Sequence, residues 1–466
     1  MNKRKTYYLF LISLISAMGG LLFGYDWVVI GGAKPFYEPF FGISANPAMQ
    51  GWAMSSALLG CLAGAILSGR ASDKYGRKKM LIISAFLFIL SAIGTGATDS
   101  FNMFIVYRIV GGFAIGVASN LSPMYIAEIA PAKMRGRFVS LNQLTIVIGI
   151  LAAQIINMLL AEPVADNATI QMIKESWNGQ LGWRWMFWME NIPAAIFFIF
   201  SFVIPESPRW LMINGQKEKA LKIMAKIMSD EQVEQERKAL EESLNSDSNS
   251  ESGGLRAILK PSMRKVLVIG IVLAVFQQWC GINVIFNYAQ EIFTAAGYGV
   301  SDILMNIVVT GATNVIFTVV AMTLVDKIGR RPLLLIGAGG LSIIYILMGA
   351  AYYFEITGVA LLIVVVAAIA CYAMSLAPIM WVVISEIFPT AVRGMAMSIA
   401  TFALWLACFI LTYTFPILNS TLGAAGTFWI YGLICIGGFI FTYKNVPETK
   451  NKSLEEIEEE LIKGEF

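Results

Sequence analysis

Long apolar segments follow one another along the chain, each close to the roughly 20 residues that an α-helix needs to cross a bilayer. Lipid offers no partners to backbone polar groups, so continuous apolar segments of this length predict helices rather than barrel strands. With 57% hydrophobic and only 14% charged residues, the chain is too apolar for a soluble globule. We predict an all-α membrane protein with twelve spans, at about 7–31, 51–69, 80–98, 101–124, 138–160, 183–204, 266–290, 302–325, 333–353, 358–384, 395–417 and 424–443.

Lysine and arginine gather in alternate connections between these spans, at 3–5, 70–79, 133–137 and 327–331. The positive-inside rule then predicts that both termini are cytoplasmic. We expect a multi-pass protein of a plasma membrane, specifically a bacterial inner membrane. The net charge of +3 follows from this bias and indicates no nucleic-acid partner.

Several motifs occur twice. DKYGRKK at 73–79 returns as DKIGRRP at 326–332, EIAPAKMRG at 128–136 returns as EIFPTAVRG at 386–394, and PESPR at 205–209 is echoed by PET at 447–449. The repeats predict two six-helix halves, 1–213 and 263–446, with a cytoplasmic helical linker at 214–262 and a cytoplasmic tail at 447–466. Two parallel halves are typical of secondary transporters, in which the halves rock about a central site.

The charges of the repeated motifs are expected to form cytoplasmic salt bridges that hold one conformation and break in the other. Each could instead be a topology signal or a solvated ion pair of little strength. Recurrence at matched positions favours a gate, with Glu128 pairing with Arg135 and Glu386 with Arg393. The predicted gate residues are Asp73, Arg77, Glu128, Arg135, Glu206, Arg209, Asp326, Arg330, Glu386 and Arg393.

Asp26 is the only charge between residues 7 and 30, where a charge costs about 2.5–3.5 kcal/mol and is kept for a pathway, a relay or a partner. The chain has no histidine, so a proton that moves through it must be carried by a carboxylate. Arg108 and Glu190 are predicted at a similar depth, about 10 Å into their helices. Protonation of Asp26 would release Arg108 and shift the conformational balance. The alternative is a structural ion pair in a uniporter.

Amide side chains cluster in the seventh span, at Gln277, Gln278 and Asn283, where they are expensive unless they bind something. A sugar needs such hydrogen-bonding groups and an aromatic face for its ring. Further candidates are Gln143, Asn314, Trp381 and Trp405. Other amides in the membrane, Asn142, Gln154 and Asn157, are interpreted as contacts between helices.

In these residues and motifs, the chain resembles the sugar-porter family of the major facilitator superfamily over essentially its whole length. The shared motifs, in order, are GR-x-x-DK-x-GR-[KR], YRI-x-GG, PMYIAEIAP-x-x-x-RG, PESPRWL, QQ-x-x-GIN, DK-x-GRRP, W-x-x-x-SEIFP-x-x-x-RG and VPETK. The likeness is greatest to bacterial xylose– and arabinose–proton symporters, with kinship to mammalian glucose facilitators.

This resemblance implies roles for individual residues. In the symporters the residue matching Asp26 carries the proton, that matching Arg108 modulates it and that matching Glu190 assists, whereas facilitators have a neutral residue at the aspartate position. The positions that match sugar-binding or cavity-lining residues are Phe23, Gln143, Gln277, Gln278, Asn283, Tyr288, Asn314, Trp381 and Trp405. The chain departs from the family pattern at Ile150, Asn287 and Leu404, so neither xylose nor glucose carries over as its substrate.

These observations favour a monomeric monosaccharide–proton symporter, for a pentose or a hexose, with the bilayer as its environment. The sequence holds no nucleotide-binding loop, metal cluster or nucleophile constellation, so we expect neither an enzyme nor a cofactor. One alternative is a sugar uniporter without proton coupling. A membrane sugar sensor is a second, although such sensors tend to carry longer cytoplasmic tails. A drug–proton antiporter would lack the amides of the seventh span.

Overall fold

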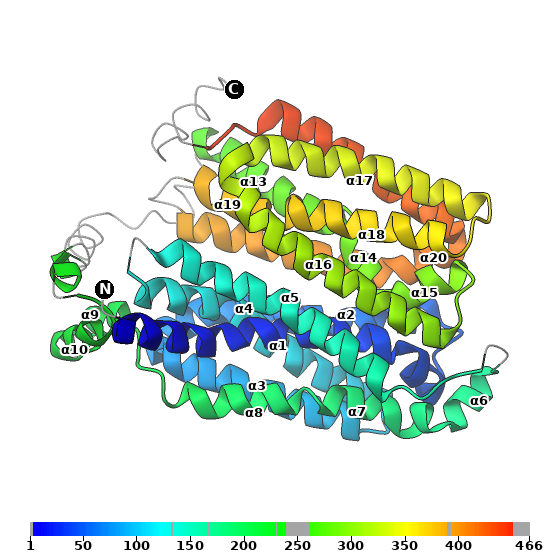
Figure 1. Cartoon of the computed structure of the whole chain (residues 1–466), viewed down its shortest axis with the longest axis horizontal. Helices are drawn as coiled ribbons and strands as arrows, with labels where there is room; N and C mark the ends of the chain where they lie inside the picture. Colours follow the sequence, from blue (N-terminus) through cyan, green and yellow to red (C-terminus); the bar gives the residue numbers. More distant parts are fainter. Residues whose placement is uncertain are drawn as a thin grey trace. The chain divides into compact units, whose positions relative to one another are not determined.

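The computed structural model is built of helices joined by short turns (Figure 1). It describes residues 3–131, 134–165, 168–229, 231–235, 237–238, 261–388 and 393–450, and no strand occurs among them. Two compact units divide the chain. Unit 1 comprises Met1–Trp27, Leu59–Ile150 and Phe187–Ser252, and unit 2 comprises Val28–Leu58, Leu151–Met186 and Gly253–Phe466.

Three long helices, which pass from one unit into the other, are α1 (Lys3–Phe41), α2 (Pro47–Tyr75) and α5 (Arg135–Leu160). In unit 1, α3 (Arg77–Ala97) packs along α4 (Phe101–Ile129) and α8 (Asn191–Ser201). The helix α9 (Pro208–Ile213) packs on α10 (Lys217–Ile227).

Unit 2 contains α6 (Ile170–Glu175), the short π-helix Asn178–Gly182 and the whole described C-terminal half. Helix α7 (Trp183–Trp188) begins in unit 2 and ends in unit 1. The helices of the C-terminal half are α13 (Pro261–Trp279), α14 (Ile282–Asn287), α15 (Ala289–Ala295), α16 (Val300–Ile328), α17 (Arg330–Tyr353), α18 (Val359–Met374), α19 (Leu376–Ile387) and α20 (Arg393–Asn445). Helix α20 packs along both α13 and α17.

Ten helices in the described chain are long and apolar enough to cross a membrane. Helix α20 covers both the eleventh and the twelfth predicted span, because it consists of two helices that meet at a kink at Gly423, whose φ of 69° and ψ of 174° are not helical. The sixth predicted span, 183–204, is divided into α7 and α8 by a turn at Met189 and Glu190. Counted in this way, the ten helices and the divided span account for all twelve predicted spans.

The end of the first helix differs from the sequence prediction. Helix α1 continues from residue 31 to Phe41, and the charges in its added turns, Lys34 and Glu38, form an i,i+4 ion pair. The compact units divide the chain by its contacts rather than by its repeats, because segments 28–58 and 151–186 pack with the C-terminal half in unit 2. The packing of these helix ends, which hydropathy does not encode, sets the division.

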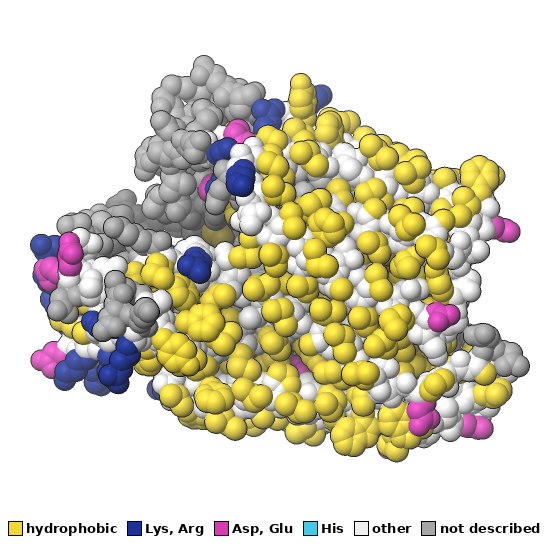
Figure 2. All heavy atoms as spheres, viewed as in Figure 1, with side chains coloured by type: hydrophobic (Ala, Val, Ile, Leu, Met, Phe, Trp, Pro, Cys, Tyr) yellow, Lys and Arg dark blue, Asp and Glu magenta, His cyan; other side chains and the backbone are white. Residues whose placement is uncertain are grey.

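Apolar side chains cover the helices on the face drawn in Figure 2, and Lys and Arg side chains gather over α9 and α10. Many of the outward-facing residues are large and aliphatic, for example Leu159 in α5 and Ile343 in α17, which are 72% and 63% exposed. Water would not favour such exposure over whole helices, whereas lipid tails solvate it. This surface is the one expected of helices in a bilayer.

Candidate functional site: a buried ion pair, a broken helix and two charge networks

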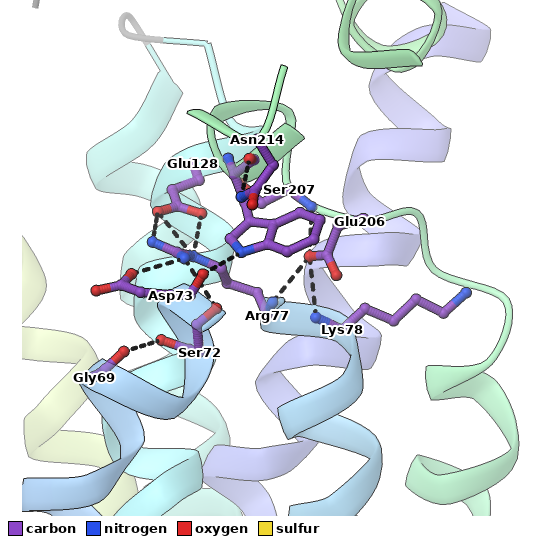
Figure 3. Close-up of polar contacts among 10 residues, drawn as sticks. Gly69, Ser72, Asp73, Arg77, Lys78, Glu128, Glu206, Ser207 and Asn214 are labelled. Carbon is purple, nitrogen blue, oxygen red and sulfur yellow. Dashed lines mark hydrogen bonds and ion pairs between the residues drawn. The ribbon is translucent and has the colours of Figure 1, made fainter. Parts of the chain in front are cut away.

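A charge network surrounds Arg77 at the start of α3 (Figure 3). Its guanidinium Nε and Nη2 donate to the carboxylate of Glu128 in α4 at 3.1 Å, and its Nη1 donates to Asp73 Oδ1 at 2.9 Å and to Ser72 O at 3.2 Å. Arg77 is only 5% exposed and the Glu128 side chain is also largely buried, so the charge-assisted bonds between them are shielded from water, whereas the Asp73 carboxylate is exposed. The network ties α2, α3 and α4 together within unit 1.

Glu206 completes this network from the segment before α9. Its Oε1 accepts hydrogen bonds from the backbone N–H groups of Arg77 at 3.0 Å and Lys78 at 3.1 Å, so the carboxylate caps the start of α3. A helix N-terminus has free N–H groups and a partial positive charge, which a carboxylate satisfies. Gly76 precedes α3 with φ +96°, and a Cβ there would lie 2.2 Å from Glu206 Oε2. Glycine is therefore required for both the turn and the cap.

The same arrangement recurs at the start of α17 in unit 2. Glu448 Oε1 and Oε2 accept from the backbone N–H groups of Arg330 at 3.0 Å and Arg331 at 3.1 Å, after Gly329 with φ +105°. The Arg330 guanidinium pairs with Glu386 at 3.3 Å, as Arg77 does with Glu128. Glu448 is not among the predicted gate residues, although the PET echo at 447–449 places it where Glu206 stands in PESPR.

The networks contain part of the predicted gate. Glu128 pairs with Arg77 and Glu386 pairs with Arg330, and the pairings of Glu128 with Arg135 and of Glu386 with Arg393 stay predictions. Arg135 and Arg209 are exposed. The side chains of Asp326 and Arg393 lie outside the described part of the chain. Each of these two carboxylates pairs with an arginine at a helix start, beside a turn that another carboxylate caps.

Asp26 in α1 and Arg108 in α4 form a buried ion pair in unit 1. Arg108 Nη1 donates to Asp26 Oδ1 and its Nη2 to the Asp26 backbone carbonyl, and both side chains are 2% exposed. Asp26 Oδ2 has no hydrogen-bond partner in the described part of the chain. Gly111, one turn beyond Arg108, admits the carboxylate, since a Cβ there would be 2.9 Å from Oδ2. The arginine and glycine of YRI-x-GG thus build one site.

Glu190 lies in the turn between α7 and α8, 2% exposed, within electrostatic reach of both Asp26 and Arg108. Its Oε1 has no hydrogen-bond partner among the described residues. The Arg108 guanidinium also stacks 5.7 Å from the ring of the neighbouring Phe187. Two carboxylates and one arginine therefore share a dry environment, in which a gained or lost proton changes the local charge strongly.

The seventh span is broken twice, and its amides lie at the breaks. Helix α13 ends at Trp279, Gly281 adopts φ +86°, and α14 gives way to α15 at Tyr288. Gln278 Oε1 accepts a hydrogen bond from Asn283 across the first break. Broken helices free backbone and amide groups for a ligand at the centre of transporters.

Gln277 reaches a second broken helix. Its Nε2 donates to the carbonyls of Leu376 and Ala377, both at 3.4 Å, just past Ser375, where α18 gives way to α19. Gln277 Oε1 is buried and has no hydrogen-bond partner in the described part of the chain. An unsatisfied buried acceptor costs free energy unless a water or a ligand hydroxyl donates to it.

The remaining predicted sugar residues lie as follows. Tyr288 is buried, and its hydroxyl donates to Thr412 O at 2.6 Å. The centre of its ring lies 4.5 Å from the centre of the Phe415 ring. Asn314 in α16 and Trp405 in α20 are each 6% exposed. Gln143 and Phe23 are half-buried in unit 1, where Phe23 makes an edge contact with Trp27. The side chain of Trp381 lies outside the described part of the chain.

Known proteins share this sequence and this fold. Residues 12–461 match the family described as sugar (and other) transporter. The arabinose-proton symporter of Bacillus subtilis (strain 168) is 41% identical over 98% of this chain and 96% of its own length. The D-xylose-proton symporter of Escherichia coli (strain K12) is 40% identical over 97% of this chain and 95% of its own length. A solved inward-open structure of the xylose transporter XylE from E. coli superimposes with a TM-score of 0.83, at 38% identity, over 97% of this chain and 99% of that one.

The protein is a multi-pass membrane transporter of the major facilitator fold. The chain belongs to the sugar (and other) transporter family.

Proposed function

We propose that this protein is a monosaccharide–proton symporter that imports a pentose or a hexose across a bacterial inner membrane. The observation that carries the proposal is the buried pair of Asp26 and Arg108, beside Glu190, in a chain without histidine. Protonation of Asp26 removes the charge that holds Arg108, and this change biases the balance between inward- and outward-facing states. The relatives named as arabinose- and xylose-proton symporters support the same chemistry.

The sugar site is proposed at the broken helices, with Gln277, Gln278 and Asn283 as hydrogen-bonding partners. Their amides, the unsatisfied Oε1 of Gln277 and the nearby backbone carbonyls match the many hydroxyls of a sugar. Gln143, Asn314, Trp381 and Trp405 complete the proposed set, with Phe23 and Tyr288 lining the cavity. Asn287 and Leu404 take the place of polar or aromatic family residues, and we propose that they narrow the choice of sugar.

The charge networks are proposed as cytoplasmic gates, with the protein a monomer whose termini both face the cytoplasm. A buried, multiply bonded arginine such as Arg77 holds one conformation firmly, and its bonds must be exchanged when the helices that it joins move apart.

The experiment is uptake into sealed proteoliposomes with a panel of pentoses and hexoses, with and without an imposed pH gradient. We expect one sugar to accumulate only with the gradient and the external medium to become alkaline during uptake. Uptake without proton movement would make the protein a uniporter. Binding without any uptake would make it a sensor.

A further inference from the structure

Unit 2 contains a second buried group of charges, which the proposed proton and sugar sites do not use. Lys34 Nζ lies 3.1 Å from Glu38 Oε1, one turn along α1, and it also pairs with Glu291 Oε1 in α15. Lys34 is 1% exposed and Glu38 is 5% exposed. These three residues are called the Lys34 triad below.

The triad joins several elements. Gln50 in α2 donates to Glu38 Oε2 at 3.0 Å and to Ser44 O at 3.0 Å, which fixes the turn between α1 and α2 beside the ion pairs. Taking the charges of Lys34 and Glu38 out of water is costly, whereas the Glu291 side chain stays 24% exposed. A buried ion pair often contributes less to stability than apolar packing would. An ionisable group kept at such a place points to a role beyond stability.

Lys34 also contacts a residue of the proposed sugar cavity. Its Nζ lies 5.3 Å from the centre of the Tyr288 ring, a cation–π contact, and the Tyr288 hydroxyl donates to Thr412 O in α20 at 2.6 Å. Tyr288 stands at the break between α14 and α15, next to Asn287. One cation therefore holds both the carboxylate of α15 and the aromatic ring at the start of that helix.

These contacts cross between the repeats of the sequence. Helices α1 and α2 come from the first six-helix repeat, and α15 and α20 from the second. The backbones are close here, since a Cβ on Gly51 in α2 would lie 2.4 Å from Tyr413 O in α20. A transporter that alternates its access must separate its repeats at each end in turn. The pair of Lys34 with Glu291 cannot persist once α15 leaves α1.

We propose that the Lys34 triad is a latch of the end at which α1 meets α15, and that Lys34 is the positioning residue that couples this closure to Tyr288 of the sugar site. The latch is closed in this structure, and it opens when the sugar site becomes accessible from that end. The proposal rests on the proposed function, because a latch needs a carrier that alternates its access. It also rests on the proposed orientation of the protein in the membrane, which makes this end the extracellular one.

The test measures access to α15. Ala289, 2% exposed, is replaced by cysteine in a background whose five native cysteines are changed to alanine. Intact cells and inside-out vesicles are treated with a membrane-impermeant maleimide, without sugar or pH gradient. Labelling in cells should be slow in the parent and about tenfold faster in Lys34→Met and in Glu291→Gln, because each loses the pair that favours the closed state.

The charge exchange Lys34→Glu with Glu291→Lys keeps one ammonium group and two carboxylates, and it should restore slow labelling. Lys174→Met, which removes another lysine of unit 2, should leave the rate unchanged. Equal rates in Lys34→Met and the parent, or fast labelling in a well-expressed exchange variant, would overturn the latch. Because labelling needs no transport, failure of sugar-coupled proton uptake would count against the proposed function alone.

Discussion

At the scale of single residues, Asp26 differs from Glu206 and Glu448 in how few bonds hold its charge. Glu206 and Glu448 each accept several hydrogen bonds, whereas one oxygen of Asp26 accepts from Arg108 and the other has no hydrogen-bond partner in the described part of the chain. A buried carboxylate with a free oxygen has room for a proton at that atom. Removing a partner from a buried pair costs about 3–5 kcal/mol, so the neutral isostere asparagine is the informative replacement.

Asp26→Asn should abolish accumulation of sugar driven by a pH gradient or a membrane potential and retain counterflow exchange, because binding and reorientation need no net proton movement. For the parent, 100 mV corresponds to about 2.3 kcal/mol per charge, or roughly a fifty-fold sugar gradient. The measurement is uptake in proteoliposomes. Asp302→Asn, an exposed aspartate in the first turn of α16, is the matched control and should accumulate normally. A variant that still concentrates sugar contradicts the assignment of Asp26.

Gln278→Ala should weaken sugar binding about tenfold, the effect of one lost hydrogen bond to a buried polar ligand, without changing the amount of protein in the membrane. The matched control is Gln154→Ala, since Gln154 is a glutamine in α5 that is 1% exposed and lies against Gly311 of α16. Equilibrium binding of the transported sugar is the measurement. Equal affinities in Gln278→Ala and the parent would exclude Gln278 from the site.

At the scale of the element, α3 and α17 begin in the same way, with a glycine at positive φ under a carboxylate from a distant segment. The repeat of this device in the two halves explains why D-x-x-G-R occurs twice. The arginine that follows the glycine is fixed by the capped turn, and it then pairs with a glutamate of a neighbouring helix.

Gly76→Ala should destabilise the protein by about 2 kcal/mol or more, because the backbone region is accessible almost only to glycine and the new Cβ would meet Glu206. Gly69 lies inside α2, and no atom lies within 4 Å of a Cβ added there. Gly69→Ala should therefore leave the stability of the protein unchanged or raise it by about 0.5–1 kcal/mol. Thermal unfolding in detergent, followed by the monodisperse fraction, compares the two. Equal melting temperatures would refute the role of the turn.

The sequence predicts the elements better than their interruptions. Hydropathy locates the spans because every helix in lipid must be apolar, but it says nothing of where a helix unwinds. The breaks at Gly281 and Tyr288 depend on tertiary packing, and the same holds for the break at Ser375.

The candidate site is predictable to the same degree. The pairing of Asp26 with Arg108 follows from two charges at one depth, because each needs a partner there. The pair of Arg77 with Glu128 did not follow, since the capped turn that places Arg77 depends on Glu206, a residue far away in the sequence. The sequence prediction missed Lys34 and Glu38 because they lie beyond the predicted end of the first span. It missed Glu291 because this residue lies among polar neighbours.

At the scale of the whole molecule, the compact units and the sequence repeats divide the chain differently. The repeats are a property of the sequence, whereas the units reflect which helix ends pack together in this structure. In unit 2 the segments 28–58 and 151–186 pack with the C-terminal half. We therefore expect the units to change with conformation while the repeats persist.

The proposed orientation predicts sided labelling of exposed positions. A cysteine at Phe354, which is 71% exposed between α17 and α18, should react with an impermeant maleimide in intact cells. A cysteine at Asn214, exposed after α9, should react only after the membrane is permeabilised. The reverse pattern would invert the topology, and reaction of both in intact cells would contradict the number of spans between them.

The carboxylate of Glu448 has a practical consequence for anyone handling this carrier. The last described residues are anchored, since Lys450 donates its backbone N–H to Glu448 at 2.8 Å and its ammonium group to the Lys327 carbonyl at 2.7 Å. Shortening the chain before this point would strip the N-terminus of a membrane helix of its counter-charge. Affinity tags and fluorescent fusions are therefore best attached well downstream of Lys450. A deletion of the tail that removes Glu448 should be interpreted as a destabilisation of α17.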